Sequence, residues 1–145
     1  MLDCFCHTGA FALHAAHYGA KDVLGIDISE HAVQFASENA ALNGLQGNCR
    51  FQTANTFDML REYYDRGERF DTIILDPPAF TKSKNAVEGA VRGYKEINLR
   101  AMKIINSGCF LITCSCSYHV DPEMFMDVVH SAAIDAKRKV RLVEY

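Results

Sequence analysis

The chain has 145 residues, of which 49% are hydrophobic and 23% are charged, a composition that suits one globular domain with its own core rather than two. No apolar run reaches the roughly 18–20 residues that cross a bilayer, and the N-terminus lacks the basic and apolar regions of a signal peptide. We therefore expect a cytoplasmic protein without a membrane segment. The net charge of −3 does not favour nucleic-acid binding by this chain alone, so RNA affinity would need help from another domain.

Short β-rich runs alternate with helical stretches along the whole chain. We expect strands at residues 1–6, 23–28, 49–53, 72–75, 110–113 and 140–145, and helices at 10–18, 30–43, 57–64, 88–106 and 122–136. Ser29 and Asp121 are suited to cap helices, and Pro122 fits the first helical position. The alternation predicts an α/β fold with a doubly wound, mainly parallel, Rossmann-like sheet. Both terminal strands look cut short, so residues 1–145 are expected to form one partial domain, incomplete at both ends.

Six cysteines are present, and without a secretion signal we expect them to be reduced thiols. The close pairs Cys4/Cys6 and Cys114/Cys116 are spaced C-x-C rather than the C-x-x-C of zinc sites. The histidines show no metal-ligand spacing either. We expect no metal site.

Polar or reactive residues follow five consecutive predicted strands. They are found in segments 3–9, 54–56, 76–78 and 114–117, and at Asp27. In open parallel sheets, ligands bind beyond the carboxyl ends of the strands, close to the switch in strand order. The sequence therefore predicts a site at this edge of the sheet.

Gly9 and Asp27 point to a cofactor that contains adenosine. Gly9 allows a close backbone approach at a helix N-terminus, and Asp27, 18 positions later, is placed to accept the two hydroxyls of a ribose. The loop has one glycine, not the G-x-G-x-x-G of a dinucleotide site, and makes no space for a diphosphate. S-adenosylmethionine, which has no phosphate, fits this loop better. Asn55 could contact the adenine edge, although asparagine is also common in turns.

The Asp76-Pro77-Pro78 segment and the cysteines after the fifth strand indicate the chemistry. Two prolines fix the backbone beside Asp76, which suits a planar substrate. C5 of cytosine is a weak nucleophile, but a thiolate that adds to C6 makes C5 reactive. Cys116, between two serines at a strand end, has the polar and partly exposed setting that such a thiolate needs.

Several segments occur in an order that resembles one known family. They are residues 3–11, 25–29, 43–45 with Asn39, 76–80, 92–95 with Asn98, and 115–117. Together they resemble the large-subunit (23S) ribosomal RNA cytosine-C5 methyltransferases of the class I superfamily. The resemblance spans nearly the whole chain, and the stretch around Tyr94 and the Ser-Cys-Ser are its most specific parts.

The resemblance implies a seven-stranded fold that binds S-adenosylmethionine at the first three strand ends. The cofactor-binding residues expected on this basis are Phe5, Thr8, Gly9, Asp27, Ile28, Asn55, Thr56 and Asp76. It implies Cys116 as the nucleophile, with Cys114 second, and Asp76 as the group that orients the cytosine, with Pro77, Pro78 and Phe80 at the substrate. The family usually adds an N-terminal RNA-binding PUA domain. Ala79 stands where lysine is common, which weakens one substrate contact.

Three other functions compete with this one. An amino-group methyltransferase uses Asp/Asn-Pro-Pro followed directly by an aromatic residue, whereas Ala79 precedes Phe80 here. A non-catalytic module that only binds the cofactor is the second alternative. A nicotinamide oxidoreductase is the third, and it lacks its glycine-rich loop.

Overall fold

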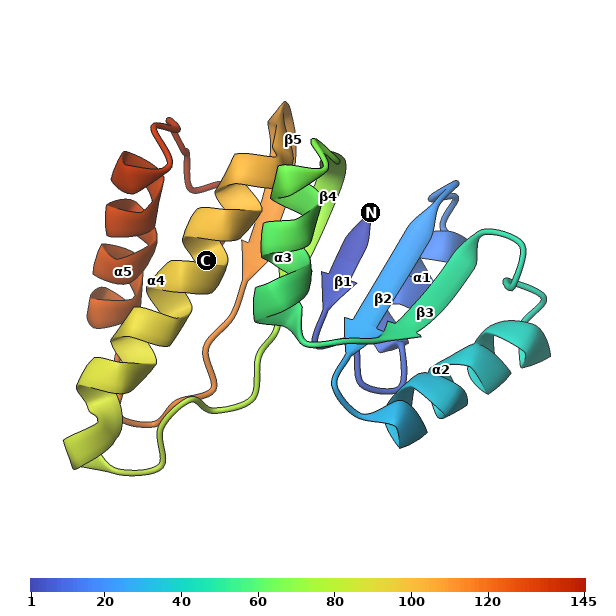
Figure 1. The fold of residues 1–145 in the computed structure, drawn as a ribbon, viewed down its shortest axis with the longest axis horizontal. Coiled ribbons are helices and arrows are strands. Elements are labelled where there is room, and N and C mark those ends of the chain that lie inside the picture. The colour runs from blue at the N-terminus through green and yellow to red at the C-terminus, as the bar shows by residue number, and fades with distance from the viewer.

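A computed structural model describes residues 1–145. Five strands form one sheet in the order β3-β2-β1-β4-β5, and every neighbouring pair is parallel (Figure 1). The strands are β1 Leu2–Cys4, β2 Val23–Asp27, β3 Cys49–Thr53, β4 Phe70–Leu75 and β5 Ile105–Thr113. The predicted parallel α/β sheet is therefore confirmed.

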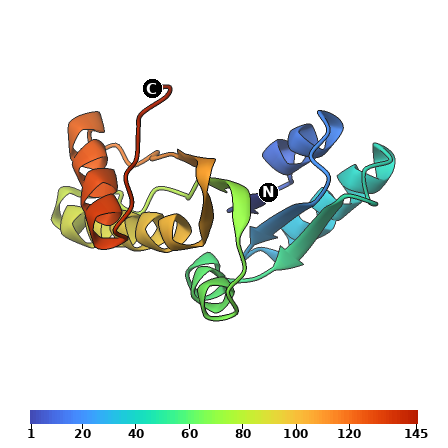
Figure 2. The same cartoon turned by 90° about the horizontal axis from the view of Figure 1, so that it is seen from above.

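Helices cover both faces of this sheet, as Figure 2 shows from above. The helices are α1 Ala10–His17, α2 Glu30–Leu42, α3 Thr56–Asp65, α4 Val87–Ile104 and α5 Pro122–Asp135, with a 3₁₀ turn at Lys84–Ala86. Helices α1 and α2 lie on one face, α3 and α4 lie on the other, and α5 packs against α4. This is the doubly wound arrangement predicted from the sequence. None of the helices has both the length and the apolar character needed to cross a membrane.

Side-chain caps begin three of the helices. The Ser29 hydroxyl accepts a hydrogen bond from the amide of Ala32 at 3.3 Å, and the Asp121 carboxylate accepts one from Met124 at 2.8 Å. Both predicted caps are confirmed. Asn55 caps α3 in the same way, because its side-chain oxygen accepts from the amide of Phe57 at 2.9 Å.

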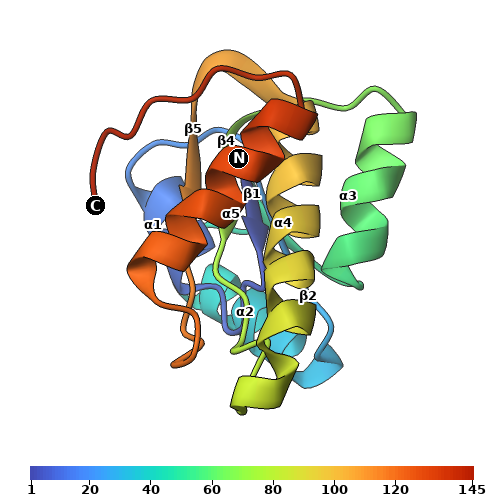
Figure 3. The same ribbon diagram turned by 90° about the vertical axis from the view of Figure 1, so that its left-hand side faces the viewer.

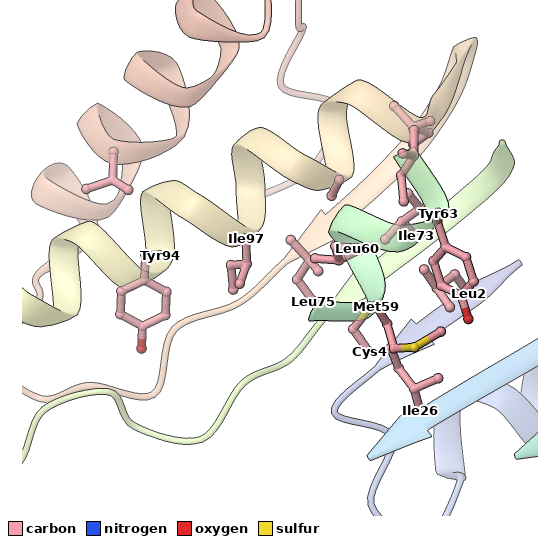
Figure 4. Packing of buried hydrophobic residues seen from close by; sticks show 14 of the residues in the cluster. Leu2, Cys4, Ile26, Met59, Leu60, Tyr63, Ile73, Leu75, Tyr94 and Ile97 are labelled. Atoms are coloured by element: carbon pink, nitrogen blue, oxygen red, sulfur yellow. The ribbon is translucent and has the colours of Figure 1, made fainter. Parts of the chain in front are cut away.

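The main core lies between the sheet and helices α3 and α4 (Figure 4). Its fully buried side chains include Leu2, Ile26, Leu60, Ile73, Leu75, Tyr94 and Ile97. Helical spacing predicts an inner face of Tyr94, Ile97, Ala101, Ile104 and Ile105 for the helix at 88–106, and all five are buried.

On α3 the helical spacing of Phe57, Leu60 and Tyr64 predicts that these three side chains face inward. For Tyr64 this is wrong: Tyr63 is buried and Tyr64 is 41% exposed, because the residue three positions after Leu60, rather than four, faces the sheet.

Two further predictions are also wrong: the boundary between α4 and β5, and the strand at residues 140–145. Helix α4 ends at Ile104 rather than at residue 106, and β5 begins at once, with a register shift opposite Phe70–Thr72. Gly108, at φ 77°, takes up the irregularity within the strand. Residues 140–145 form no strand and are exposed (Figure 3). Their alternating pattern is typical of a strand, but a strand needs a neighbour to pair with, and they have none.

Gly9 ends the loop that follows β1, and its backbone has φ 86°. A Cβ atom built there would lie 2.7 Å from the Phe51 ring and 3.1 Å from the Cβ of Ala36. Gly9 thus brings the start of α1 against β3 and α2. Gly19 is a natural comparison, because it also has a positive φ, 103°, but nothing lies within 4 Å of its added Cβ.

We predict that Gly19→Ala lowers the free energy of unfolding by about 1 kcal/mol, the cost of the left-handed backbone alone. Gly9→Ala should lose about 1–3 kcal/mol more, because its methyl group also overlaps Phe51. Urea denaturation of both variants measures the difference. Equal losses of unfolding free energy in the two variants would show that the Phe51 ring moves aside without cost.

Candidate functional site

A cavity of about 500 Å³ opens at the carboxyl edge of the sheet. Its lining residues come from the loops after β1, β2, β3 and β4, and they are Phe5, His7, Asp27, Ile28, Asn55, Thr56, Phe57, Asp76, Pro78 and Phe80. The structure thus brings together six of the eight residues predicted to bind the cofactor. Thr8, Gly9, Pro77 and the predicted nucleophile Cys116 do not line the cavity. No group of three or more His, Cys, Asp or Glu residues has the arrangement of a metal site.

The loop after β1 forms one wall in an unusual backbone conformation. Phe5 and His7 have φ values of 64° and 47°, in the left-handed region that non-glycine residues rarely occupy. The amide of Gly9 donates to the carbonyl of Cys6 at 2.8 Å and closes the turn. Such strained residues persist where their surroundings hold them, and they gather at ligand sites.

Asp27 holds that loop in place. One carboxylate oxygen accepts from the amide of His7 at 2.8 Å, and the other accepts from the amide of Ser29 at 2.9 Å. Because each carboxylate oxygen can accept a second hydrogen bond, Asp27 keeps capacity for two ligand hydroxyls. The predicted ribose contact is compatible with this geometry and stays a prediction.

The opposite wall comes from the residues around the start of α3. The side-chain oxygen of Asn55 is used in the helix cap, so only its amide group remains to donate to a ligand. Thr56 is buried, and Ile28 is 73% exposed at the cavity. In the same cavity, the exposed isoleucine suits one face of a flat heterocycle and the free amide donor suits one edge.

The two candidate cysteines differ in environment. The Cys116 thiol is exposed and donates a weak hydrogen bond to the carbonyl of Pro77, with 3.5 Å between sulfur and oxygen. Cys114 is half-buried, and burial together with the negative charge of Asp76 raises the pKa of its thiol. The amide of Cys114 also continues the pairing of β5 with β4, because it donates to the carbonyl of Leu75 at 2.8 Å. Cys116 is therefore the more accessible thiol. It does not line the cavity itself, but its contact with Pro77 places it against the loop whose neighbouring residues Asp76 and Pro78 do.

Three features can be compared with those of known proteins: the strand order, the cavity at the switch in that order, and the thiol beside an Asp-Pro-Pro loop. A family model described as a methyltransferase domain matches residues 1–141. The chain belongs to this methyltransferase domain family. The ribosomal RNA large subunit methyltransferase I of Shewanella denitrificans is 46% identical over 145 residues, a match that covers 99% of this chain and 36% of the relative. The methyltransferase domain described here thus spans about a third of the length of the curated relatives it matches.

Solved structures resemble the methyltransferase domain as well. SMU.776, solved in complex with SAH, has a TM-score of 0.79 at 21% identity, covering 90% of this chain and 34% of that one. The SAM-dependent methyltransferase from Agrobacterium tumefaciens has a TM-score of 0.77 at 22% identity, covering 91% of this chain and 43% of that one. At these identities the likeness establishes a shared fold.

Phe80, predicted at the substrate, lines the cavity but also packs into a cluster of rings. Its centroid lies 4.6 Å from that of Tyr94, 5.9 Å from Phe57 and 6.4 Å from Phe5. These contacts cover part of the Phe80 ring, so a substrate base could stack only on the part of the ring that faces the cavity. Its substrate role stays a prediction.

The structure adds two cavity residues that were not predicted individually, and it gives Asp3, in the predicted segment 3–9, a buried position. His7, in the loop after β1, and Phe57, in the first turn of α3, both line the cavity. Asp3 is fully buried in β1: one carboxylate oxygen accepts from the amide of Ala12 at 3.0 Å, and the other has no partner. An acid inside an otherwise apolar strand was the available signal.

The position of Asp3 makes it hard to ionise. Burial raises its pKa from the ordinary 3.8 to about 7; the amide of Ala12 opposes the rise, and the charges of Asp76 and Asp27 add to it. The folded state therefore holds this proton more tightly than the unfolded state. Its contribution to stability is complete below about pH 4 and is lost as the pH rises toward 7.

We predict that Asp3→Asn, which keeps an acceptor for Ala12, flattens this dependence. Between pH 4 and pH 8 the free energy of unfolding of the unmodified chain should fall by up to about 4 kcal/mol relative to the variant. Urea titrations across this range measure both curves. Parallel curves would show that Asp3 ionises normally in the folded state.

Proposed function

We propose that this methyltransferase domain uses S-adenosylmethionine to methylate C5 of a cytosine in large-subunit (23S) ribosomal RNA, in the cytoplasm, with Cys116 as the nucleophile. One observation carries the proposal: the Cys116 sulfur lies 3.5 Å from the carbonyl oxygen of Pro77. Pro77 belongs to the loop after β4, and its neighbours Asp76 and Pro78 line the cavity. A thiol in this position has no role in amino-group methylation. It has one in activating a pyrimidine ring.

The residues present fit the cofactor. The cavity volume lies within the roughly 300–1,000 Å³ common for small-molecule sites. Asp27 has acceptors for ribose hydroxyls, Asn55 has an amide donor, and Ile28 offers an apolar surface for adenine. Phe5, Thr8, Gly9, Thr56 and Asp76 complete the proposed set. When bound, S-adenosylmethionine supplies an electrophilic methyl group.

The protein's own residues would act on the cytosine as follows. The Cys116 thiolate adds to C6, and the electron pair of the C5–C6 double bond moves toward C5, which becomes nucleophilic. After C5 has gained its methyl group, loss of the C5 proton restores the double bond and expels the sulfur. Asp76, between β4 and Pro77, would hydrogen-bond the ring, while Pro78 and Phe80 would limit its position.

The RNA substrate is supported by the relatives. The Shewanella denitrificans protein, 46% identical, is named for the ribosomal RNA large subunit. A base in folded RNA must leave its stack to reach a cavity, at a cost of a few kcal/mol. With a net charge of −3, this chain contributes little general attraction for RNA, so we assign much of the affinity to other parts of a longer protein.

We predict a covalent adduct between the chain and RNA that carries 5-fluorocytosine, in the presence of S-adenosylmethionine. Fluorine at C5 cannot leave as a proton does, so the sulfur stays bound to C6. A denaturing gel should show a slower band for the unmodified chain and for Cys114→Ala, and none for Cys116→Ala.

Three results would contradict this proposal. If a chain that binds the cofactor in calorimetry gives no adduct, the cytosine-C5 reaction is excluded. Methylation of RNA amino groups that survives Cys116→Ala would instead identify an amino methyltransferase. A chain without any binding heat for S-adenosylmethionine would exclude the proposed cofactor.

We also predict that Asp27→Asn weakens S-adenosylmethionine binding by about 10-fold or more, because hydrogen bonds to a charged acceptor are lost. Asp22→Asn is the matched control, since Asp22 precedes β2 at the opposite end and is exposed. Calorimetry measures both affinities. Equal effects of the two changes would mean that general charge, not the ribose contact, matters.

A further inference from the structure

Tyr94 is the largest fully buried side chain of the molecule, and its hydroxyl has one specific partner. The Tyr94 and Ser117 oxygens are 2.8 Å apart in a buried hydrogen bond. Figure 4 shows the ring pointing away from the axis of α4, with the hydroxyl at its tip. A buried phenol normally finds such a partner. Tyr63 provides the contrast, because its hydroxyl is equally buried but has no partner.

Ser117 directly follows Cys116, so this bond reaches the loop of the proposed nucleophile. The Ser117 hydroxyl also accepts from the amide of Thr81 at 3.4 Å, and Thr81 lies just beyond the loop of Asp76. One serine thus joins α4 to the loops after both β4 and β5. The same two loops meet a second time where the Cys116 thiol donates to Pro77.

Neighbouring contacts fix Tyr94 itself. The side-chain amide of Asn98 donates to the Tyr94 carbonyl at 2.9 Å, and the Phe125 ring meets the Tyr94 ring edge-on at 5.3 Å. On the cavity side Phe80 lies over Gly93, where an added Cβ would come within 3.1 Å of the ring. The hydroxyl therefore projects from a rigid base.

We propose that Tyr94 and Ser117 are positioning residues for Cys116, and we call their hydrogen bond the hydroxyl clamp. The inference rests on the proposed role of Cys116. Attack on C6 requires the sulfur at a defined distance and angle, and an error of about 1 Å costs about 100-fold in rate. The hydroxyl clamp sets this geometry by fixing the residue after Cys116 to α4 and to the loop of Asp76.

The first test measures the single-turnover rate of adduct formation with 5-fluorocytosine RNA at saturating cofactor. Tyr94→Phe and Ser117→Ala should each slow the reaction about 10–100-fold, and the double variant should be no slower than the slower single one. Dissociation constants for RNA and S-adenosylmethionine should stay within about twofold, because neither residue lines the cavity. Tyr63→Phe, which removes an unpartnered buried hydroxyl, should react at the unmodified rate.

The second test needs neither RNA nor cofactor. Hydrogen exchange should quicken in Tyr94→Phe at the Thr81 amide and at the Val120 amide, which donates to the Ser117 carbonyl. It should stay unchanged in β2, and Tyr63→Phe should match the unmodified chain throughout. Equal adduct rates for the two phenylalanine variants, or additive losses in the double variant, would overturn the hydroxyl clamp. An unmodified chain that forms no adduct would instead remove the proposed function and this inference with it, whatever the exchange shows.

Discussion

Strand β1 is hydrogen-bonded to β2 on one side and to β4 on the other, and its three residues are fully buried. From β1 the chain winds outward through β2 and β3 and then returns to continue on the far side with β4 and β5. The helices that follow the two halves must therefore lie on opposite faces of the sheet. The loops after β1 and β4 are consequently drawn apart, and the cavity occupies the space between them.

Asp27 fixes the backbone that forms one wall of this cavity. By accepting from the amides of both His7 and Ser29, it couples the loop after β1 to the start of α2. The left-handed backbone at Phe5 and His7 persists only because these bonds and the close packing at Gly9 hold it. The loop conformation, and with it the proposed cofactor recognition, thus depends on one carboxylate. The proposed substrate side depends instead on contacts between the loops after β4 and β5.

Features with local causes could be predicted from the sequence. Strand and helix alternation, the caps at Ser29 and Asp121, and the polar strand ends all follow from neighbouring residues. Residues 140–145 could not be predicted, because pairing depends on a partner elsewhere in the chain. Periodicity placed Tyr94 on the buried face of α4, but what its hydroxyl meets is decided 23 positions away. The left-handed conformation of the loop after β1 could not be predicted either, because it depends on a hydrogen bond to Asp27, 20 positions beyond His7.

Gly93 illustrates how a residue can be restricted by what it lacks. A glycine inside a helix usually weakens it by about 1 kcal/mol relative to alanine, and position 93 is only half-buried. Most side chains would be tolerated there if burial alone decided. The Phe80 ring, however, rests on this bare stretch of backbone. A larger side chain at position 93 would therefore displace the Phe80 ring in the cavity. The residues that position 93 tolerates are thus limited by Phe80 rather than by the exposure of the helix.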